Sequence, residues 1–227
     1  MLLAIDTAGP NCAAALARAG EDGSAEILAR REIRVERGHA EHLFPLVEAV
    51  LADAAIGYPD LDRIAVTVGP GSFTGVRVGV AAARGLALAL GRPACGIGVL
   101  EALLFPLRSA GGTAVAALDA KREEVYAAIA TQDGLNLPPC LLDYDGLTKR
   151  IEEFGAPLIL TGSAAPALKT RLAAIGLAAE TATAADHADI AAVAGLALAG
   201  AGISPPRPLY LRPPDAKPQA GKAIARA

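Results

Sequence analysis

The chain has 227 residues and a mass of 22.9 kDa, a length that fits one domain or two small ones. Hydrophobic residues make up 53% and charged residues 20%, with a mean hydropathy of +0.39, which excludes a disordered chain and describes a compact, Ala- and Gly-rich fold. The 21 Lys and Arg against 24 Asp and Glu give a formal charge of -3, which excludes a broadly basic protein that binds nucleic acid or a membrane surface.

The cellular compartment is inferred from the cysteines and the N-terminus. Cys12, Cys95 and Cys140 are far apart and are expected to be small buried hydrophobes. Residues 1–6 lack a basic region and end in an acid, so we expect a strand and no signal peptide. The apolar stretch 190–203 is shorter than the roughly 20 residues of a membrane span, so we expect a cytoplasmic protein without a membrane segment.

The first half is expected to begin with three antiparallel strands and to continue with alternating helices and strands. Short apolar runs between turn residues predict strands at 2–5, 12–19, 26–35, 64–68 and 94–97. Apolar residues at three- and four-residue spacing predict helices from 38 to the turn at 57, from the turn at 69–72 to 90, and over 99–107. The Gly-rich stretch 109–112 then forms the expected seam between two halves.

The second half repeats the opening hairpin, with strands at 113–118 and 124–131 around a polar turn. Further helical and strand patterns at 146–154, 157–160, 164–175 and 188–198 predict the order β-β-α-β-α-α. From Ser204 the prolines predict an extended arm. The expected organisation is a first lobe over 1–108, a second lobe over 109–204 and a Pro-rich tail over 205–227, whose few positive charges we expect to be solvated.

Two halves of this plan resemble actin, sugar kinases and the heat-shock chaperone ATPases, in which a nucleotide lies between two related lobes. The resemblance implies an α/β, two-lobed fold of the actin-like ATPase class (ASKHA, ribonuclease H-like).

The run Gly69-Pro70-Gly71-Ser72-Phe73-Thr74-Gly75-Val76-Arg77-Val78-Gly79 closely resembles the signature of the bacterial TsaB family, also called YeaZ. Further matching segments are Ile5–Thr7, Arg37–His39 with Glu41, Gly85–Ala87, Asp119–Lys121, Glu124–Tyr126, Thr161–Ala164 and Pro208–Arg212. The resemblance covers most of the chain and is weakest over 133–155.

This resemblance implies a non-catalytic protein without a cofactor of its own. TsaB proteins are similar to TsaD, the enzyme that places threonylcarbamoyl on the adenosine beside the anticodon of tRNA. The implied role is a scaffold that pairs with a TsaD-like subunit, recruits a TsaE-like ATPase, meets tRNA only through the complex and forms a homodimer when alone.

The expected partner interface lies on the first two helices, whose apolar stripes have helical spacing. It comprises Leu43, Leu46, Val47, Val50, Val76, Arg77, Val80, Ala83, Arg84 and Ala87. The glycines of the second helix would let another helix approach closely, and Val80→Arg would then bury a charge at the interface. The alternative is that both stripes are ordinary core, and the resemblance favours the interface because TsaB and TsaD pair through these helices.

Several loop residues could face a nucleotide between the lobes: Asp6, Thr7, Gly69, Gly71, Ser72, Asp119 and Lys121. A carboxylate and a hydroxyl at Asp6 and Thr7 could hold magnesium and phosphate, but a structural hairpin turn is favoured because only Gly9 is available to wrap a phosphate. The turn at Gly69 could present helix N–H groups to an anion or could bind nothing. A charged hairpin tip is slightly favoured for Asp119 and Lys121.

A metal site is not expected, because His39 and His42 are three residues apart and the third histidine, His187, lies in the other half. No serine lies in a nucleophile elbow. The alternatives left open are a nucleotide-dependent phosphotransferase of the same fold and a metallopeptidase-like enzyme.

Overall fold

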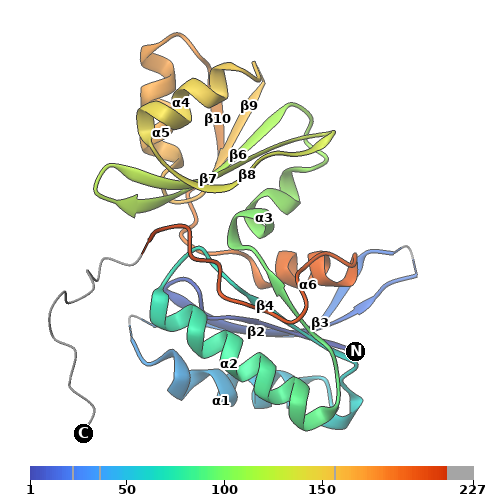
Figure 1. Ribbon diagram of the computed structural model, residues 1–227. Coiled ribbons are helices and arrows are strands. Elements are labelled where there is room, and N and C mark those ends of the chain that lie inside the picture. The colour runs from blue at the N-terminus through green and yellow to red at the C-terminus, as the bar shows by residue number, and fades with distance from the viewer. Residues whose placement is uncertain (22, 36, 156, 214–227) are drawn as a thin grey trace, which may run out of the picture.

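The first lobe is built on a mixed five-stranded sheet in the order β3-β2-β1-β4-β5 (Figure 1). The computed structural model describes residues 1–213 except Asp22, Glu36 and Ala156. The strands are β1 (Leu2–Asp6), β2 (Asn11–Ala19), β3 (Ala25–Arg34), β4 (Arg63–Thr67) and β5 (Ala94–Ile97). Central β1 pairs antiparallel with β2 and parallel with β4, and all five of its residues are buried, as its continuous apolar sequence predicts.

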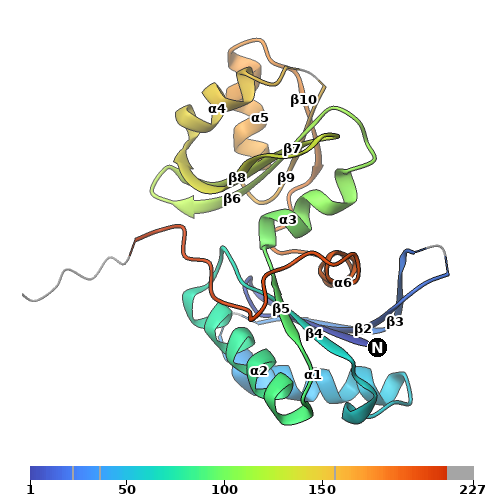
Figure 2. The same ribbon diagram turned by 45° about the vertical axis from the view of Figure 1, so that its right-hand side comes forward.

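Helices cover both faces of this sheet. Figure 2 shows α1 (His39–Asp53) and α2 (Phe73–Leu90) on one face and α6 (Ile190–Leu198) on the other. A short 3-10 helix, η1 (Tyr58–Asp60), follows α1. The apolar sequence of α6 is buried on nearly every side because this helix lies between the sheet and α3 (Val99–Leu104).

The second lobe repeats the first with a sheet in the order β8-β7-β6-β9-β10. Its strands are β6 (Thr113–Lys121), β7 (Glu124–Thr131), β8 (Gly134–Asp143), β9 (Leu158–Thr161) and β10 (Ala179–Thr183). One face packs on α4 (Tyr144–Glu152) and α5 (Ala165–Ala174), and the other on α3, which η2 (Phe105–Leu107) follows. The expected two-lobed actin-like α/β class is confirmed by this duplicated topology.

Two strands of the second lobe, β8 and β10, were absent from the sequence prediction. Both lie at sheet edges, where one side of the strand needs no pairing partner. In β8 the pair Pro138-Pro139 argues against a strand, but the register with β7 shifts at these two residues and accommodates them. With these strands the second half has the same strand and helix order as the first.

The chain crosses between the lobes more often than the predicted boundaries allow. One buried core joins the first sheet, α3, α6 and the inner face of the second sheet, and a second core lies between the second sheet, α4 and α5. Since α6 packs on β1 and β2, it belongs to the first lobe and not to the expected second lobe of 109–204.

The Pro-rich stretch is extended, as expected, but its described part lies against the first lobe. Ile203 pairs with Gly96 of β5, and the Leu209 N–H donates to the carbonyl of Val68 over 2.7 Å. Arg212 forms an ion pair with Glu124 of the second lobe. Residues 203–213, here called the strap, therefore bind both lobes, and the rest of the expected tail, from 214, lies outside the described residues.

By length and composition alone, α2 could cross a membrane, with a mean hydropathy of 1.4 over 18 residues. In the structure α2 packs one side on β4 and leaves the other exposed, which identifies it as a partly buried helix of the first lobe.

Candidate functional site

Several hollows of the described residues lie where the lobes meet, and two of them bear on the predicted residues. The first, here called the cleft, has a volume of about 630 Å³. Its walls include Ala8–Pro10, Gly71, Ser72, Leu118–Lys121, Ser163 and Asp186. The cleft therefore brings together four of the seven residues predicted to face a nucleotide: Gly71, Ser72, Asp119 and Lys121.

Asp6 and Thr7 do not reach the cleft. Their exposed fractions are 1% and 0%. One Asp6 carboxylate oxygen, Oδ1, accepts hydrogen bonds from the Thr67 hydroxyl and from the Ala8 N–H, the latter over 2.9 Å. The Thr7 hydroxyl donates to the Gly75 carbonyl over 2.7 Å. The favoured interpretation, a structural hairpin turn, describes both residues in this structure.

Glycines in α2 and just before it leave the space in which this hairpin turn packs. A Cβ atom at Gly75 would lie 2.0 Å from the Thr7 carbonyl oxygen, and one at Gly79 would lie 2.4 Å from the Thr7 hydroxyl. A Cβ at Gly71 would lie 2.2 Å from the Ala8 carbonyl oxygen. At Gly75 and Gly79 the sequence predicts room for a partner helix. The correction is that the β1–β2 turn of the same chain occupies that space.

Contacts within the chain also use two of the N–H groups with which the start of α2 could bind an anion. The Ser72 N–H donates to the Ala8 carbonyl over 2.7 Å, and the Ser72 hydroxyl caps the helix by accepting from the Gly75 N–H. Gly69 is buried at a φ of 108°, which a glycine adopts without strain. The turn at 69–72 therefore serves chiefly to pack β4, α2 and the β1–β2 turn against one another.

Asp119 and Lys121 close a hairpin tip at the edge of the cleft. One Asp119 carboxylate oxygen accepts from the Lys121 N–H over 2.8 Å, and the other accepts from the Lys121 ammonium over 2.7 Å. These bonds to Lys121 lower the pKa of Asp119. Lys121 is 81% exposed, so its charge is available to solvent at the mouth of the cleft.

Burial raises the pKa of Asp6, and the hydrogen bond from Thr67 only partly offsets this effect. The folded state then holds the Asp6 proton more tightly than the unfolded chain, so this residue's contribution to stability falls as pH rises from the ordinary aspartate pKa through the raised one. We expect Asp6→Asn to make the free energy of unfolding less sensitive to pH across this window. Urea unfolding of the variant and of wild type at several pH values between 4 and 8 measures this pH dependence. Parallel plots of the free energy of unfolding against pH for the two proteins would contradict the prediction.

The three histidines have different environments. The ring of His39 is buried and its Nε2 lies 3.0 Å from the Gly9 carbonyl oxygen, while His42 is exposed. His187 lies between Asp186 and Glu32. Among the described residues, no group of three or more His, Cys, Asp and Glu side chains is arranged to hold a metal ion.

The predicted partner interface needs correction at six of its ten positions. These six side chains are 4% exposed or less and pack in the first lobe: Leu43, Val47, Val50, Val76, Val80 and Ala83. Leu46 and Ala87 are half-buried, and only Arg77 and Arg84 are exposed. The apolar stripe of a surface helix faces its own sheet first, so it identifies the core side of α1 and α2.

On the outward side of α2 the sequence prediction contains only Arg77 and Arg84. Phe73, Arg77, Ala81, Arg84 and Leu88 recur at three- and four-residue spacing and are all exposed, Leu88 by 86%. This set is here called the α2 stripe. It contains large apolar side chains and two arginines, and α2 contains no acidic residue. Such a surface is typical of a protein interface, and the helical spacing outside the buried positions was the available signal.

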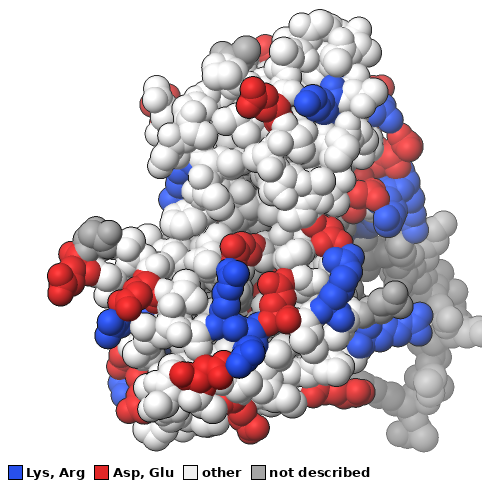
Figure 3. Space-filling model, turned by 180° about the vertical axis from the view of Figure 1, so that it is seen from behind, with Lys and Arg blue, Asp and Glu red and all other residues white. Residues whose placement is uncertain are grey.

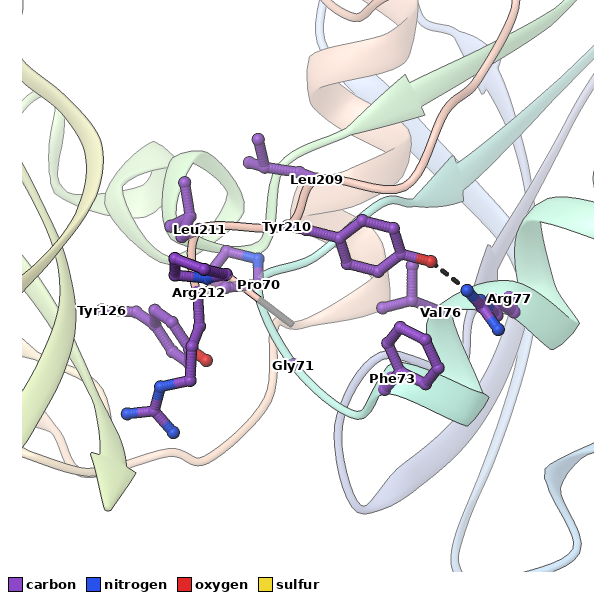
Figure 4. Close-up of a pocket in the computed structure, with 11 residues that line it drawn as sticks. Pro70, Gly71, Phe73, Val76, Arg77, Tyr126, Leu209, Tyr210, Leu211 and Arg212 are labelled. Carbon is purple, nitrogen blue, oxygen red and sulfur yellow. Dashed lines mark hydrogen bonds between the residues drawn. The ribbon is translucent and has the colours of Figure 1, made fainter. Parts of the chain in front are cut away.

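The second hollow, here called the α2 pocket, has a volume of about 550 Å³ and lies between the start of α2 and the strap (Figure 4). Pro70, Val76, Tyr126, Leu209 and Leu211 give it an apolar wall. At its edge the Arg77 guanidinium lies 3.7 Å from the centre of the Phe73 ring, and its Nε donates to the Tyr210 hydroxyl over 2.9 Å. Two aromatic side chains thus hold Arg77 in a defined orientation.

The face of the molecule that lies behind in Figure 1 carries charges of both signs. Figure 3 shows basic and acidic side chains side by side on that face. Among the described residues, the Arg34–Asp186 and Arg31–Asp53 ion pairs each have a shortest distance of 2.7 Å.

The fold and the cleft define a two-lobed protein of the actin-like class in which the β1–β2 turn packs directly on α2. The family model of tRNA N6-adenosine threonylcarbamoyltransferase (TsaD) matches residues 31–194. Together with the relatives and structures described next, this match shows that the chain belongs to the TsaB/YeaZ family.

Some relatives match nearly the whole chain and others match part of it. An uncharacterized protein of Mycobacterium tuberculosis strain H37Rv is 37% identical over 231 residues, covering 96% of this chain and 95% of the relative. The tRNA threonylcarbamoyladenosine biosynthesis protein TsaB of Haemophilus influenzae is 39% identical over 128 residues, 55% of this chain and 51% of that protein. The TsaB of Escherichia coli K12 is 37% identical over 134 residues, 58% of this chain and 55% of that protein.

Solved structures of the family have the same fold. YeaZ from Pseudomonas aeruginosa superposes with a TM-score of 0.65 at 26% identity, covering 92% of this chain and 99% of that one. A Pseudomonas aeruginosa protein described as similar to peptidase YeaZ gives a TM-score of 0.71 at 26% identity, with 93% and 99% covered.

Proposed function

We propose that this chain is a non-catalytic, TsaB-type subunit of tRNA threonylcarbamoyladenosine biosynthesis. It pairs with a TsaD-like catalytic subunit, recruits a TsaE-like ATPase, meets tRNA through that complex and works in the cytoplasm without a cofactor of its own. Alone, it forms a homodimer. Membership of the TsaB/YeaZ family supports a role in this pathway. The two relatives that are named TsaB align with 55% and 58% of this chain.

The observation that carries the non-catalytic role is the packing of the β1–β2 turn. Asp6 and Thr7 are the residues that would hold metal and phosphate in a related ATPase, and here both are buried and bonded to Thr67, Ala8 and Gly75. A phosphate could reach them only if the turn separated from α2, which the contacts at Gly75 and Gly79 oppose. This arrangement supports binding over chemistry as the contribution of the chain.

The outward side of α1 and α2 is the proposed pairing surface. The two helices lie side by side on the same face of the first sheet (Figures 1 and 2). The α2 stripe adds exposed apolar area and two arginines, and arginine is enriched among the residues that dominate binding at protein interfaces. Leu46 and Ala87 remain in the proposal as half-buried residues that a partner could cover.

The direct test is the solution mass of the chain alone and mixed with the TsaD-like protein of the same genome. Light scattering after size exclusion is expected to show a homodimer that gives way to a one-to-one heterodimer. A reconstituted assay with TsaD-like, TsaE-like and tRNA components should then form the modified adenosine only when the chain is present. Unchanged elution of the two folded proteins would contradict the proposed role.

The same preparation tests the phosphotransferase alternative, because Gly71, Ser72 and Lys121 do line the cleft. Calorimetry with ATP and magnesium on the isolated chain is expected to show no binding tighter than roughly 10 μM, or about −7 kcal/mol. Tighter binding that depends on Lys121 would favour the enzyme over the scaffold.

A further inference from the structure

Residues 184–189, which connect β10 to α6, border a further hollow besides the cleft. Asp186 lines the cleft, whereas His187 and Asp189 line this other hollow, here called the β9 hollow. The β9 hollow has a volume of about 370 Å³, and its walls come from β3, from α3 and η2, and from the ends of β9 and β10. These two strands are parallel, and ligands of α/β sheets bind beyond the carboxyl ends of parallel strands.

Thr161, the last residue of β9, brings a buried hydroxyl without a partner to the β9 hollow. Leu158 and Leu160 of the same strand pack in the core with α4 and α5, so the alternation of the strand turns Thr161 to the opposite side. Thr161 is 1% exposed, and its Oγ1 atom has no hydrogen-bond partner within the described residues. A buried hydroxyl without a partner costs free energy, which a polar ligand group bonded to it would offset.

Charges of both signs line the same hollow. Arg30 and Glu32 are two residues apart on β3 and therefore lie on the same face of this strand. The closest approach of Arg30 to Asp189, 3.8 Å, is too long for a hydrogen bond. Glu32 uses its Oε1 atom toward Asn11 and His187, and its Oε2 atom has no hydrogen bond within the described residues. A guanidinium and a carboxylate oxygen thus remain available to a ligand.

This charge pattern favours a ligand that carries both signs. A phosphate or sulfate ion at Arg30 would lie near two carboxylates, those of Glu32 and Asp189, and a simple cation at the carboxylates would lie near Arg30. A zwitterion avoids both conflicts, because a guanidinium binds a carboxylate through two parallel hydrogen bonds and a carboxylate binds an ammonium group. A volume of about 370 Å³ is near the lower end of the range for ligand pockets, so the ligand is small.

The wall of the hollow at residues 186–187 is held in place by contacts within the chain. Asp186 forms an ion pair with Arg34 over 2.7 Å. A Cβ atom at Gly9 would lie 3.0 Å from the Cβ of His187, so this segment packs closely on the β1–β2 turn. A wall that is already ordered in the free chain lowers the entropic cost of binding a ligand.

We propose that the β9 hollow binds a small zwitterionic amino acid with a hydroxyl side chain. Arg30 binds its carboxylate, Glu32 and Asp189 bind its ammonium group, and the Thr161 hydroxyl bonds to its side-chain hydroxyl. The apolar part of the wall contacts the carbon atoms of its side chain and consists of Ala102, Leu103 and Pro106. None of these residues belongs to the proposed pairing surface, so the isolated chain is sufficient for binding.

NMR titration of the isotope-labelled full chain with L-threonine tests this site. The dissociation constant is expected to be about 1 mM or lower, with shifts at residues around the β9 hollow. L-Valine has the same shape but no hydroxyl and is expected to bind at least about tenfold more weakly, because the Thr161 hydroxyl then stays without a partner. Threonine methyl ester and N-acetylthreonine, which each lack one of the two charges, should show the same loss.

Two single variants and a matched control locate the binding. Thr161→Val and Arg30→Gln are each expected to raise the dissociation constant for L-threonine about tenfold, because each removes one hydrogen-bonding group. Arg31→Gln should leave the constant unchanged, since Arg31 is the neighbouring arginine on the opposite face of β3 and pairs with Asp53. Circular dichroism is expected to show a wild-type fold for Thr161→Val, because its hydroxyl has no partner to lose.

Three results would each overturn the proposed amino-acid site. They are a titration that does not approach saturation by about 20 mM L-threonine, L-valine binding as tightly as L-threonine, and wild-type affinity in either Thr161→Val or Arg30→Gln. If Thr161→Val does not fold, the comparison of Arg30→Gln with Arg31→Gln decides, since both arginines are exposed on the surface of β3.

Discussion

Replacing Gly75 with alanine is expected to lower the free energy of unfolding by roughly 2–4 kcal/mol, although alanine is the better helix former. The added Cβ would lie 2.0 Å from the Thr7 carbonyl oxygen, a backbone atom that cannot rotate away. Either α2 or the β1–β2 turn must move, and the bond from the Thr7 hydroxyl to the Gly75 carbonyl is then strained or lost. Urea unfolding of the purified variant measures the change.

Gly85→Ala is the matched control for Gly75→Ala. Gly85 lies in the same helix, is exposed, and has no atom within 4 Å of an added Cβ. This substitution should stabilise the protein by about 0.5–1 kcal/mol, because it removes only the entropic cost of glycine. If both variants changed stability by the same amount and sign, the turn would not pack on α2 as described.

Leu88→Arg is expected to weaken pairing with a TsaD-like subunit at least about tenfold while leaving the fold intact. Leu88 is 86% exposed in the last turns of α2, so an arginine there meets solvent in the free chain and disturbs only a bound partner. Titration of the labelled variant with the TsaD-like protein measures the affinity, and its melting temperature should match that of wild type. Wild-type affinity would remove this end of α2 from the proposed surface.

Val80→Arg should behave differently from the expectation that its charge would lie at the interface. Val80 is 4% exposed and faces the sheet of the first lobe, so the arginine would be buried without a partner. We expect a loss of several kcal/mol of stability and loss of cooperative folding, and with it loss of pairing. A folded Val80→Arg variant with defective pairing alone would restore the original interpretation of this position.

The pair of variants shows what hydrophobic periodicity can and cannot reveal. Val80 and Leu88 both belong to the apolar helix predicted up to Leu90, and both are aliphatic. Which side of α2 faces the sheet follows from the contacts of this helix with β4. The hydrophobic pattern alone does not contain these contacts. A helix with apolar residues on both sides leaves the core side and the partner side indistinguishable until the sheet is placed.

The same limit applies to the edge strands and the lobe boundary. β10 has exposed polar residues and β8 has two prolines, so neither has the pattern of a buried strand. Their strand conformation comes from pairing with β9 and β7. The assignment of α6 to the first lobe likewise depends on chain crossings that no local pattern records.

The sequence by itself determined the family, the two-lobed class and most elements, because apolar periodicity, turn residues and the run Gly69–Gly79 are local features of the chain. It also indicated that Asp6 and Thr7 form a structural turn. Only the tertiary structure decided which glycines of α2 receive that turn, which side of α2 is exposed and how the strap forms a pocket. These depend on contacts between residues far apart in sequence, such as Thr7 with Gly75 and Arg77 with Tyr210.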